Sequence, residues 1–363
     1  MPNSLRWLLW PVIAGLVAGL AIVALRQPAV PAPLPASSSA APGYASAFNR
    51  AAPAVVNIYT SKVVQTPRSS VFEDPILRHF FRRGNPAERE KVERSLGSGV
   101  IVSDQGYLLT NLHVIQGADE ILVLLQDGRQ SIARLIGSDP ETDLAVLKIN
   151  LPELQPIALG NTPQVQVGDI VLAIGNPYGF GQSMSQGIVS AKGRYGLGLT
   201  NYENFIQTDA AINPGNSGGA LVDHEGRLIG INTAIYTQSG GSTGIGLAIP
   251  ADLALRTMKD IIEYGRPVRG WLGLEVKSVA PQSNGVVISA IMPGGPAAKA
   301  GLKIGDVIFA INETPVGDGH AGMNEIAATR PGSTVSLDFA RAGERQRLDI
   351  VVGIRPAPVA ASG

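Results

Sequence analysis

Short apolar runs separated by turn residues limit most strongly how this chain can fold. Such runs occupy residues 100–102, 121–125, 144–149, 170–174, 187–191, 220–222 and 228–232. Turn-forming pairs such as Asp127-Gly128 lie between them, and the chain of 363 residues contains 43 glycines. Strands this short, joined by glycine-rich turns, favour a sandwich or paired β-barrels over a sheet with crossover helices.

One helix interrupts this pattern and predicts a domain boundary. Residues 252–264 carry apolar side chains at helical spacing, and Gly265 and Pro267 then end the helix. A second unit of domain size follows, with its own strands and a short predicted helix over 323–329. We therefore expect a first domain over 44–265, a second over 266–357, and a disordered tail over 358–363. Between Ser61 and Ser95, a polar and charged stretch predicts a long loop inside the first domain.

The N-terminus contains an uncharged run from Trp7 to Leu25, closed by Arg26. This length is close to the roughly 20 residues of a membrane-spanning helix, so residues 1–26 are predicted to be a membrane anchor. The alternative is a cleaved export signal, and both predict that the rest of the chain crosses a membrane. Residues 27–43 are rich in Ala, Pro and Ser and predict a semi-extended tether.

Charge and composition exclude several classes of function. The 29 basic and 29 acidic side chains balance, and no basic stripe suggests a nucleic-acid partner. No cysteine is present, which excludes disulfides and a thiol nucleophile. Neither histidines nor acids cluster at metal-ligand spacing, so we expect no metal and no other cofactor.

Three motifs in the first domain predict a catalytic triad. They are Thr110-Asn111-Leu112-His113, Thr142-Asp143-Leu144-Ala145 and Gly215-Asn216-Ser217-Gly218-Gly219, in the order His, Asp, Ser. A serine hydroxyl needs a base to take its proton, and the histidine needs a carboxylate to fix its tautomer. His113, Asp143 and Ser217 are therefore the predicted catalytic residues.

Other positions follow from the same motifs. The turn at Gly215, Asn216 and Ser217 can aim backbone amides at a developing oxyanion. Ala211 stands where an acid would favour a basic substrate side chain, so Ala211, Ile212 and Ile235 predict a pocket for a small aliphatic residue. Ordinary core packing is the alternative for both isoleucines.

Alternatives exist for the triad as well. His113 could be a core histidine, Asp143 a strand cap and Ser217 a turn residue. Asp139 is the rival acid, but Asp139-Pro140 is typical of a turn. The coincidence of three motifs in a known triad order favours the catalytic interpretation.

These motifs, together with Gly97-Ser98-Gly99-Val100 and Gly244-Ile245-Gly246-Leu247, closely resemble the HtrA family of serine proteases from about Tyr44 to Gly353. The resemblance implies a trypsin-like double β-barrel. The second unit resembles a PDZ domain through Gly270-Trp271-Leu272-Gly273-Leu274 and 295–302. A PDZ domain binds a C-terminal peptide as an added strand, with amides of a loop such as Trp271, Leu272, Gly273 and Leu274 holding its carboxylate. Met323, Ile326 and Ala327 are predicted to flank its side-chain pocket.

An anchor, one protease domain and one PDZ domain are similar to the DegS/AlgW type within that family. The resemblance implies a homotrimer on the bacterial inner membrane whose protease and PDZ domains lie in the periplasm. It implies that C-terminal peptides of misfolded outer-membrane proteins bind the PDZ domain and relieve inhibition of the active site. It also implies that the protease cleaves a membrane-bound anti-sigma factor. Arg194 matches the position whose side chain, in proteins of that type, contacts the PDZ domain when the protease is switched between its inhibited and active states. The alternative is an ordinary exposed arginine.

Two other functions remain open from the sequence. A general periplasmic quality-control protease would use the same triad. A peptide-binding sensor or chaperone would not need catalysis, although the intact triad favours an enzyme.

Overall fold

The structure is a computed structural model that describes residues 5–25, 43–64, 91–177, 181–235, 244–278, 285–317 and 319–356. The chain divides into two units, Met1–Gly43 and Tyr44–Gly363. In the first unit the described residues are Gly43 and the helix α1 (Leu5–Leu25), which contains Pro11. Among the residues described, no helix is both long and apolar enough to cross a membrane. Most of the predicted tether and the predicted tail lie outside the described residues.

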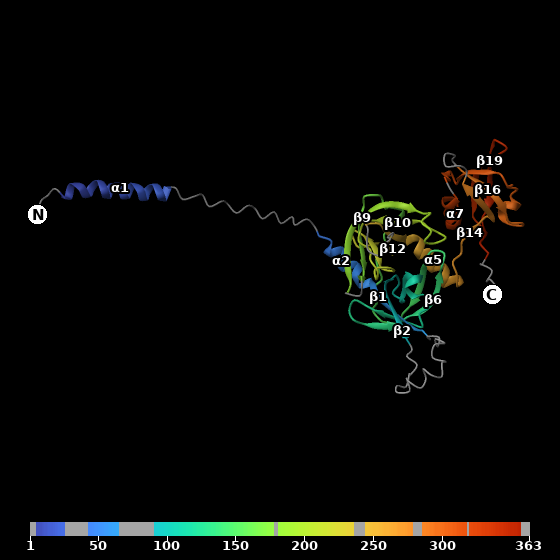
Figure 1. The fold of residues 1–363 in the computed structure, drawn as a ribbon, viewed down its shortest axis with the longest axis horizontal. Coiled ribbons are helices and arrows are strands. Elements are labelled where there is room, and N and C mark those ends of the chain that lie inside the picture. Colours follow the sequence, from blue (N-terminus) through green and yellow to red (C-terminus); the bar gives the residue numbers. More distant parts are fainter. Residues whose placement is uncertain are drawn as a thin grey trace, which may run out of the picture. The chain divides into compact units, whose positions relative to one another are not determined.

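The second unit begins with a seven-stranded antiparallel sheet in the order β5-β4-β1-β2-β3-β7-β6. Figure 1 labels β1, β2 and β6 of this sheet. Its strands are β1 (Val55–Val64), β2 (Lys91–Ile101), β3 (Tyr107–Asn111), β4 (Glu120–Leu124), β5 (Gln130–Ile132), β6 (Arg134–Asp139) and β7 (Leu144–Lys148). The helices α2 (Ala45–Ala51) and η1 (Ala52–Ala54) precede it, and α4 (Leu112–Ile115) follows β3 directly.

A closed six-stranded barrel follows in the order β10-β13-β12-β11-β8-β9. Its strands are β8 (Ile170–Gly175), β9 (Ser183–Arg194), β10 (Phe205–Thr208), β11 (Ala220–Asp223), β12 (Leu228–Ile235) and β13 (Gly246–Pro250), and η3 (Thr162–Gln164) precedes them. One core of buried apolar side chains includes residues of both sheets, among them Ile58, Leu108, Leu144 and Ile174. The fold is therefore mainly β, as the short apolar runs predicted.

The helix α5 (Ala251–Tyr264) leads from the barrel to the second domain. Its buried side chains include Ala254 and Ile261, and Gly265 ends it in the left-handed conformation (φ 72°) while donating to the carbonyl of Ile261. A glycine tolerates this φ because it has no Cβ. This helix matches the sequence prediction closely.

The second domain has its own core and sheets. One sheet follows the order β15-β16-β17-β19-β20 with β18 beside β17, and β14 pairs with β21. The elements are β14 (Gly270–Trp271), β15 (Leu274–Ser278), β16 (Val286–Ile291), α6 (Pro296–Lys299), β17 (Val307–Ile311), β18 (Thr314–Pro315), α7 (Gly319–Ala328), β19 (Thr334–Arg341), β20 (Glu344–Val351) and β21 (Gly353–Ile354). The predicted short helix exists as α7 but begins earlier than expected.

The predicted long loop between Ser61 and Ser95 is shorter than expected. Residues up to Val64 continue β1, and residues from Lys91 belong to β2, with Ser61 paired to Arg94. Cross-strand pairing extends the hairpin into sequence that is polar, because an exposed ladder satisfies its backbone groups without apolar side chains. Residues 65–90 lie outside the described part.

A buried ion pair in the second domain predicts a pH-dependent stability. Arg341 donates to both carboxylate oxygens of Asp306, at 2.8 and 2.6 Å, and the side chain of Asp306 is 2% exposed. The hydrogen bonds from Arg341 hold the pKa of Asp306 below its ordinary value. This pair therefore stabilises the domain above the ordinary Asp pKa of about 3.9, and the contribution is lost as pH falls below it.

We expect Asp306→Asn to lower the free energy of unfolding by about 2 kcal/mol at pH 7. The difference from the wild type should shrink as pH falls below about 3.9 and disappear below the lowered pKa of Asp306, where the wild-type carboxylate is also protonated. Chemical denaturation followed by tryptophan fluorescence at pH 7 and at acidic pH measures it. An equal difference at both pH values would show that the charge of Asp306 does not stabilise the domain.

Candidate active site

The register of the first sheet brings His113 and Asp143 together. Asn111 at the end of β3 is paired with Leu144 at the start of β7 in an antiparallel ladder. His113 lies two residues beyond the end of β3, and Asp143 lies directly before the start of β7. Because these two strands are antiparallel neighbours, both residues lie at the same end of the strand pair. Strand pairing therefore positions two of the three residues of the predicted triad, His113 and Asp143.

Asp143 binds His113 through both carboxylate oxygens. The distance from His113 Nδ1 to Asp143 Oδ2 is 2.6 Å, and the backbone amide of His113 donates to Oδ1 at 2.9 Å. This arrangement leaves the other ring nitrogen, Nε2, as the one that can exchange a proton with a nucleophile. The side chain of His113 is 47% exposed, so a substrate can reach it.

The backbone at Asp143 is unusual and is held by neighbouring residues. Asp143 has a φ of 57°, which is uncommon for a residue other than glycine. Its carbonyl accepts hydrogen bonds from the amide of Leu112 and from Asn111 Nδ2, both at 3.0 Å. The segment that carries His113 therefore also fixes the conformation of Asp143.

Asp139, the rival acid, does not contact His113. It is buried, and Oδ2 accepts hydrogen bonds from Thr142 Oγ1 and from Arg269 Nη2 in the segment that leads to the second domain. Glu141 pairs with the same Arg269 and with Arg355. The turn that carries Asp143 is thus tied to the beginning and the end of the second domain.

Ser217 lies in a tight turn directly before β11. The amide of Gly218 donates to the carbonyl of Asn232 at 2.8 Å, and the amide of Asn216 donates to Asn213 at 2.9 Å. A Cβ on Gly218, whose φ is 81°, would lie less than 3.0 Å from the carbonyl oxygen of Ser98 and from Thr110 Oγ1. Only glycine fits there, which explains the glycine after the serine.

Thr233 connects Asp143 to Ser217 through hydrogen bonds, and sequence reasoning did not identify it. Its Oγ1 donates to Asp143 Oδ2 at 3.1 Å and accepts from Asn111 Nδ2 at 3.0 Å. Its carbonyl accepts the hydroxyl of Ser217 at 3.1 Å. Nothing local in strand β12 marks Thr233, because its role depends on β12 passing beside the Ser217 turn.

Among the residues that the structure describes, the hydroxyl of Ser217 is bonded to the Thr233 carbonyl and not to His113. The carbonyl of Gly215 accepts from Ser98 Oγ at 2.7 Å, which fixes one side of the predicted oxyanion turn formed by Gly215, Asn216 and Ser217. Catalytic hydrogen bonds are often incomplete without substrate.

The predicted substrate pocket is placed only in part. Ile212 is 1% exposed and packs in the barrel core near Gly246. Ala211 is partly buried and its carbonyl accepts from Ser185 Oγ at 2.7 Å. The side chain of Ile235 lies outside the described residues. Core packing therefore accounts for Ile212 in this structure, and the pocket stays a prediction.

The residues predicted to form the peptide site of the second domain run from β14 to the start of β15 and lie on α7. Leu272 is buried, and Gly273 has a φ of 76° where a Cβ would contact the ring of Trp271 at 2.9 Å. Leu274 begins β15. On α7, Met323 is partly buried, Ile326 packs in the domain core and Ala327 lines a pocket beside the first domain.

Arg194 ends β9, and its Nε donates to Gln207 at 2.9 Å. Other residues make the described contacts between the domains. Asn324 on α7 donates to the carbonyl of Glu203, and the ring of Tyr195 stacks on His320 with centroids 6.3 Å apart. Tyr195 follows Arg194 directly, so the segment that carries Arg194 touches α7 although Arg194 bonds within its own domain.

Two family descriptions match the chain. The trypsin-like peptidase domain matches residues 97–231, and the PDZ domain matches residues 270–352. No metal-binding group of His, Asp and Glu is present in the part that the structure describes.

Curated relatives and solved structures are similar over most of the chain. A probable periplasmic serine endoprotease DegP-like of Pseudomonas putida (strain W619) is 39% identical over 343 residues, covering 88% of this chain and 71% of the relative. A relative with the same description from Hahella chejuensis is 43% identical over 337 residues, with coverages of 87% and 71%. The HtrA-type protease AlgW with a decapeptide is 53% identical with a TM-score of 0.71, covering 87% of this chain and 100% of that chain. A serine endoprotease of Yersinia pestis is 41% identical with a TM-score of 0.61, at coverages of 87% and 99%.

Proposed function

We propose that this chain, which belongs to the HtrA family of trypsin-like serine endopeptidases, is a periplasmic protease whose PDZ domain controls its active site. Its family membership and its activity as a serine endopeptidase are shown by the domain matches and the relatives. The proposal concerns what the enzyme senses and what it cleaves.

The proposed chemistry uses the three residues of the predicted triad. His113 takes the proton of Ser217 as the hydroxyl attacks the scissile carbonyl, and Asp143 stabilises the imidazolium that forms. The same histidine then donates its proton to the leaving amine. Amides of the turn at Gly215, Asn216 and Ser217 stabilise the oxyanion.

Control by the PDZ domain rests on one observation. The helix α7, which carries Met323 and Ile326 of the predicted peptide site, hydrogen-bonds the protease domain through Asn324 and Glu203. The Glu203 carboxylate in turn accepts from the amides of Leu197 and Leu199, at 2.6 Å each, in the segment after Arg194. A peptide that shifts α7 therefore acts directly on a protease loop.

We propose that the activating ligands are C-terminal peptides of misfolded outer-membrane proteins and that the substrate is a membrane-bound anti-sigma factor. AlgW structures with a tripeptide and with a decapeptide support a peptide ligand. We also propose that residues 1–26 anchor a homotrimer at the inner membrane. The uncharged run from Trp7 to Leu25 supports the anchor, and family membership alone supports the trimer.

A second candidate is a general quality-control protease of the periplasm. The DegP-like description of the curated relatives favours it. The two candidates differ in substrate range and in dependence on a PDZ ligand, which one assay can separate.

The test measures proteolysis of a candidate anti-sigma periplasmic domain and of an unfolded casein by the full chain in mild detergent. We expect cleavage of the anti-sigma domain to rise at least about tenfold when a peptide ending in an aromatic residue with a free carboxylate is added. The expected reason is a peptide-induced shift of α7 away from its contact with Glu203.

The controls are Ser217→Ala, which should be inactive, and the same peptide with an amidated C-terminus, which should not activate. Equal cleavage of both substrates without peptide would refute control by the PDZ domain and favour quality control.

A further inference from the structure

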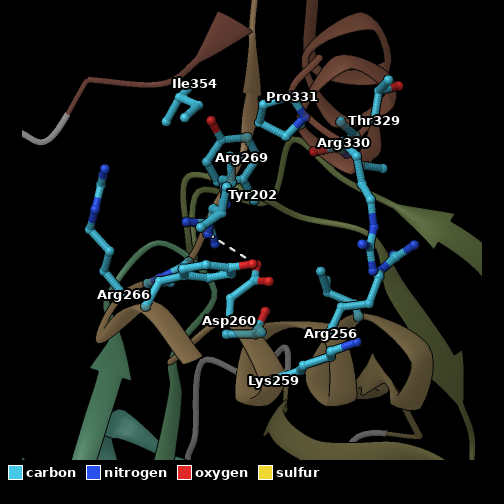
Figure 2. Close-up of a pocket in the computed structure, with 18 of the residues that line it drawn as sticks. Tyr202, Arg256, Lys259, Asp260, Arg266, Arg269, Thr329, Arg330, Pro331 and Ile354 are labelled. Atoms are coloured by element: carbon cyan, nitrogen blue, oxygen red, sulfur yellow. Dashed lines mark hydrogen bonds between the residues drawn. The ribbon is translucent and has the colours of Figure 1, made fainter. Parts of the chain in front are cut away.

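A pocket of 440 Å³ lies between α5 of the protease domain and the PDZ domain. Helix α5 forms one wall, and the end of α7 with Thr329, Arg330 and Pro331 forms another (Figure 2). Neither the catalytic residues nor the predicted peptide loop Trp271–Leu274 lines it.

Cationic side chains outnumber acidic ones in this pocket. The acidic lining residues are Asp260 and Glu263, and the cationic ones are Arg256, Lys259, Arg266, Arg269 and Arg330. Both acids already accept a hydrogen bond, Asp260 from the amide of Val268 at 3.0 Å and Glu263 from Tyr264 Oη at 2.6 Å.

Most of this positive charge has no partner within the described ranges. Arg269 is satisfied by Asp139 and Glu141. Arg256 has one solvent-exposed pair with Asp252 at 3.4 Å, which is worth little. Lys259, Arg266 and Arg330 form no ion pair with any residue that the structure describes.

Two of these cations come from different domains. Figure 2 shows Arg330 of the PDZ domain and Arg256 of α5 extending toward each other along one side of the pocket, with Lys259 near Arg256. Two positive charges close together repel each other. An anion bound between them is attracted to both and offsets this repulsion. A guanidinium group binds phosphate through paired N–H donors. Two guanidinium groups on opposite walls of a pocket can therefore hydrogen-bond the same phosphate.

We propose that this pocket binds a phosphate dianion, free or as a monoester, between Arg256 and Arg330, with Lys259 as a third cation. A dianion offers a negative charge to each arginine, whereas a single carboxylate leaves one arginine uncompensated. The bound phosphate bridges the protease and PDZ domains and holds them together.

The test titrates inorganic phosphate and glycerol 3-phosphate into the full Ser217→Ala chain in detergent, by isothermal titration calorimetry at constant ionic strength. We expect saturable binding that weakens at least about tenfold in Arg330→Glu and in Arg256→Glu. Arg330→Lys, which keeps the charge but loses the paired donors, should weaken it less than Arg330→Glu. Glycerol 3-phosphate binding with the same dependence on these variants would identify a monoester ligand, and its exclusion would identify free phosphate.

The matched control is Arg345→Glu, a PDZ-domain arginine on β20 that does not line the pocket. Its phosphate affinity should stay within about twofold of the parent. Heat signals that sodium chloride reproduces, or equal losses in Arg345→Glu and Arg330→Glu, would overturn the proposal. Binding does not depend on peptidase activity, so failure of this test leaves the proposed function untouched.

Discussion

Replacing Asp143 by asparagine is expected to lower kcat for peptide hydrolysis by about 10⁴-fold. Asp143 accepts from both Nδ1 and the backbone amide of His113. An asparagine offers only one carbonyl oxygen for these donors, and its amide group favours the wrong tautomer of the histidine. A steady-state assay with a fluorogenic peptide at saturating substrate measures the loss.

Thr233→Val is the matched variant, because it keeps the shape of the side chain and removes the hydroxyl that donates to Asp143 Oδ2 and accepts from Asn111 Nδ2. It should lower kcat by about tenfold, which corresponds to roughly 1.4 kcal/mol and lies within the range expected for losing a hydrogen bond to a charged group. Thr233→Ser should restore most of the activity. If Asp143→Asn lost less than Thr233→Val, Asp143 would not be the residue that orients His113.

Gly218→Ala is expected to damage both stability and activity. The new Cβ would lie less than 3.0 Å from the Ser98 carbonyl oxygen and from Thr110 Oγ1, at a φ of 81° that disfavours any side chain. The turn must move away from these buried neighbours, which are hydrogen-bonded to each other at 2.7 Å. We expect a loss of about 3 kcal/mol in the free energy of unfolding and at least a roughly 100-fold loss of kcat/KM, because Ser217 is displaced.

Gly128→Ala is the control for the backbone effect alone. Gly128 has a φ of 88°, but a Cβ at this position would have no neighbouring atom within 4 Å, so only the conformational strain of about 1 kcal/mol applies. Urea denaturation and the peptide assay on both variants separate strain from steric displacement. Similar losses in the two variants would mean that the close approach of Gly218 to Ser98 does not matter.

Local patterns were sufficient for much of the fold. The short apolar runs predicted a mainly β architecture, and the apolar spacing over 252–264 with Gly265 and Pro267 predicted α5 nearly to the residue. The domain matches and relatives confirm the family and the serine endopeptidase activity that the motifs around His113, Asp143 and Ser217 predicted. Such features are local because strand and helix periods, turn residues and motif order all lie within short stretches of sequence.

Contacts between distant segments could not be predicted in this way. The polar stretch at Ser61 gave no sign that β1 and β2 continue through it, because backbone pairing does not require apolar side chains. Ile212 lay in a motif but packs in the barrel core, and the sequence alone left that alternative open.

The sequence by itself predicted which residues can perform the chemistry, since residue type and order in three motifs are those expected of a base, an orienting acid and a nucleophile. The tertiary structure alone decided how these residues are held and linked. Thr233 joins Asp143 to Ser217 only because β12 passes beside the Ser217 turn. Arg256 and Arg330 face one pocket only because the PDZ domain packs beside α5. Both depend on strand register and domain packing, which bring together side chains far apart in the chain and leave no local pattern in the sequence.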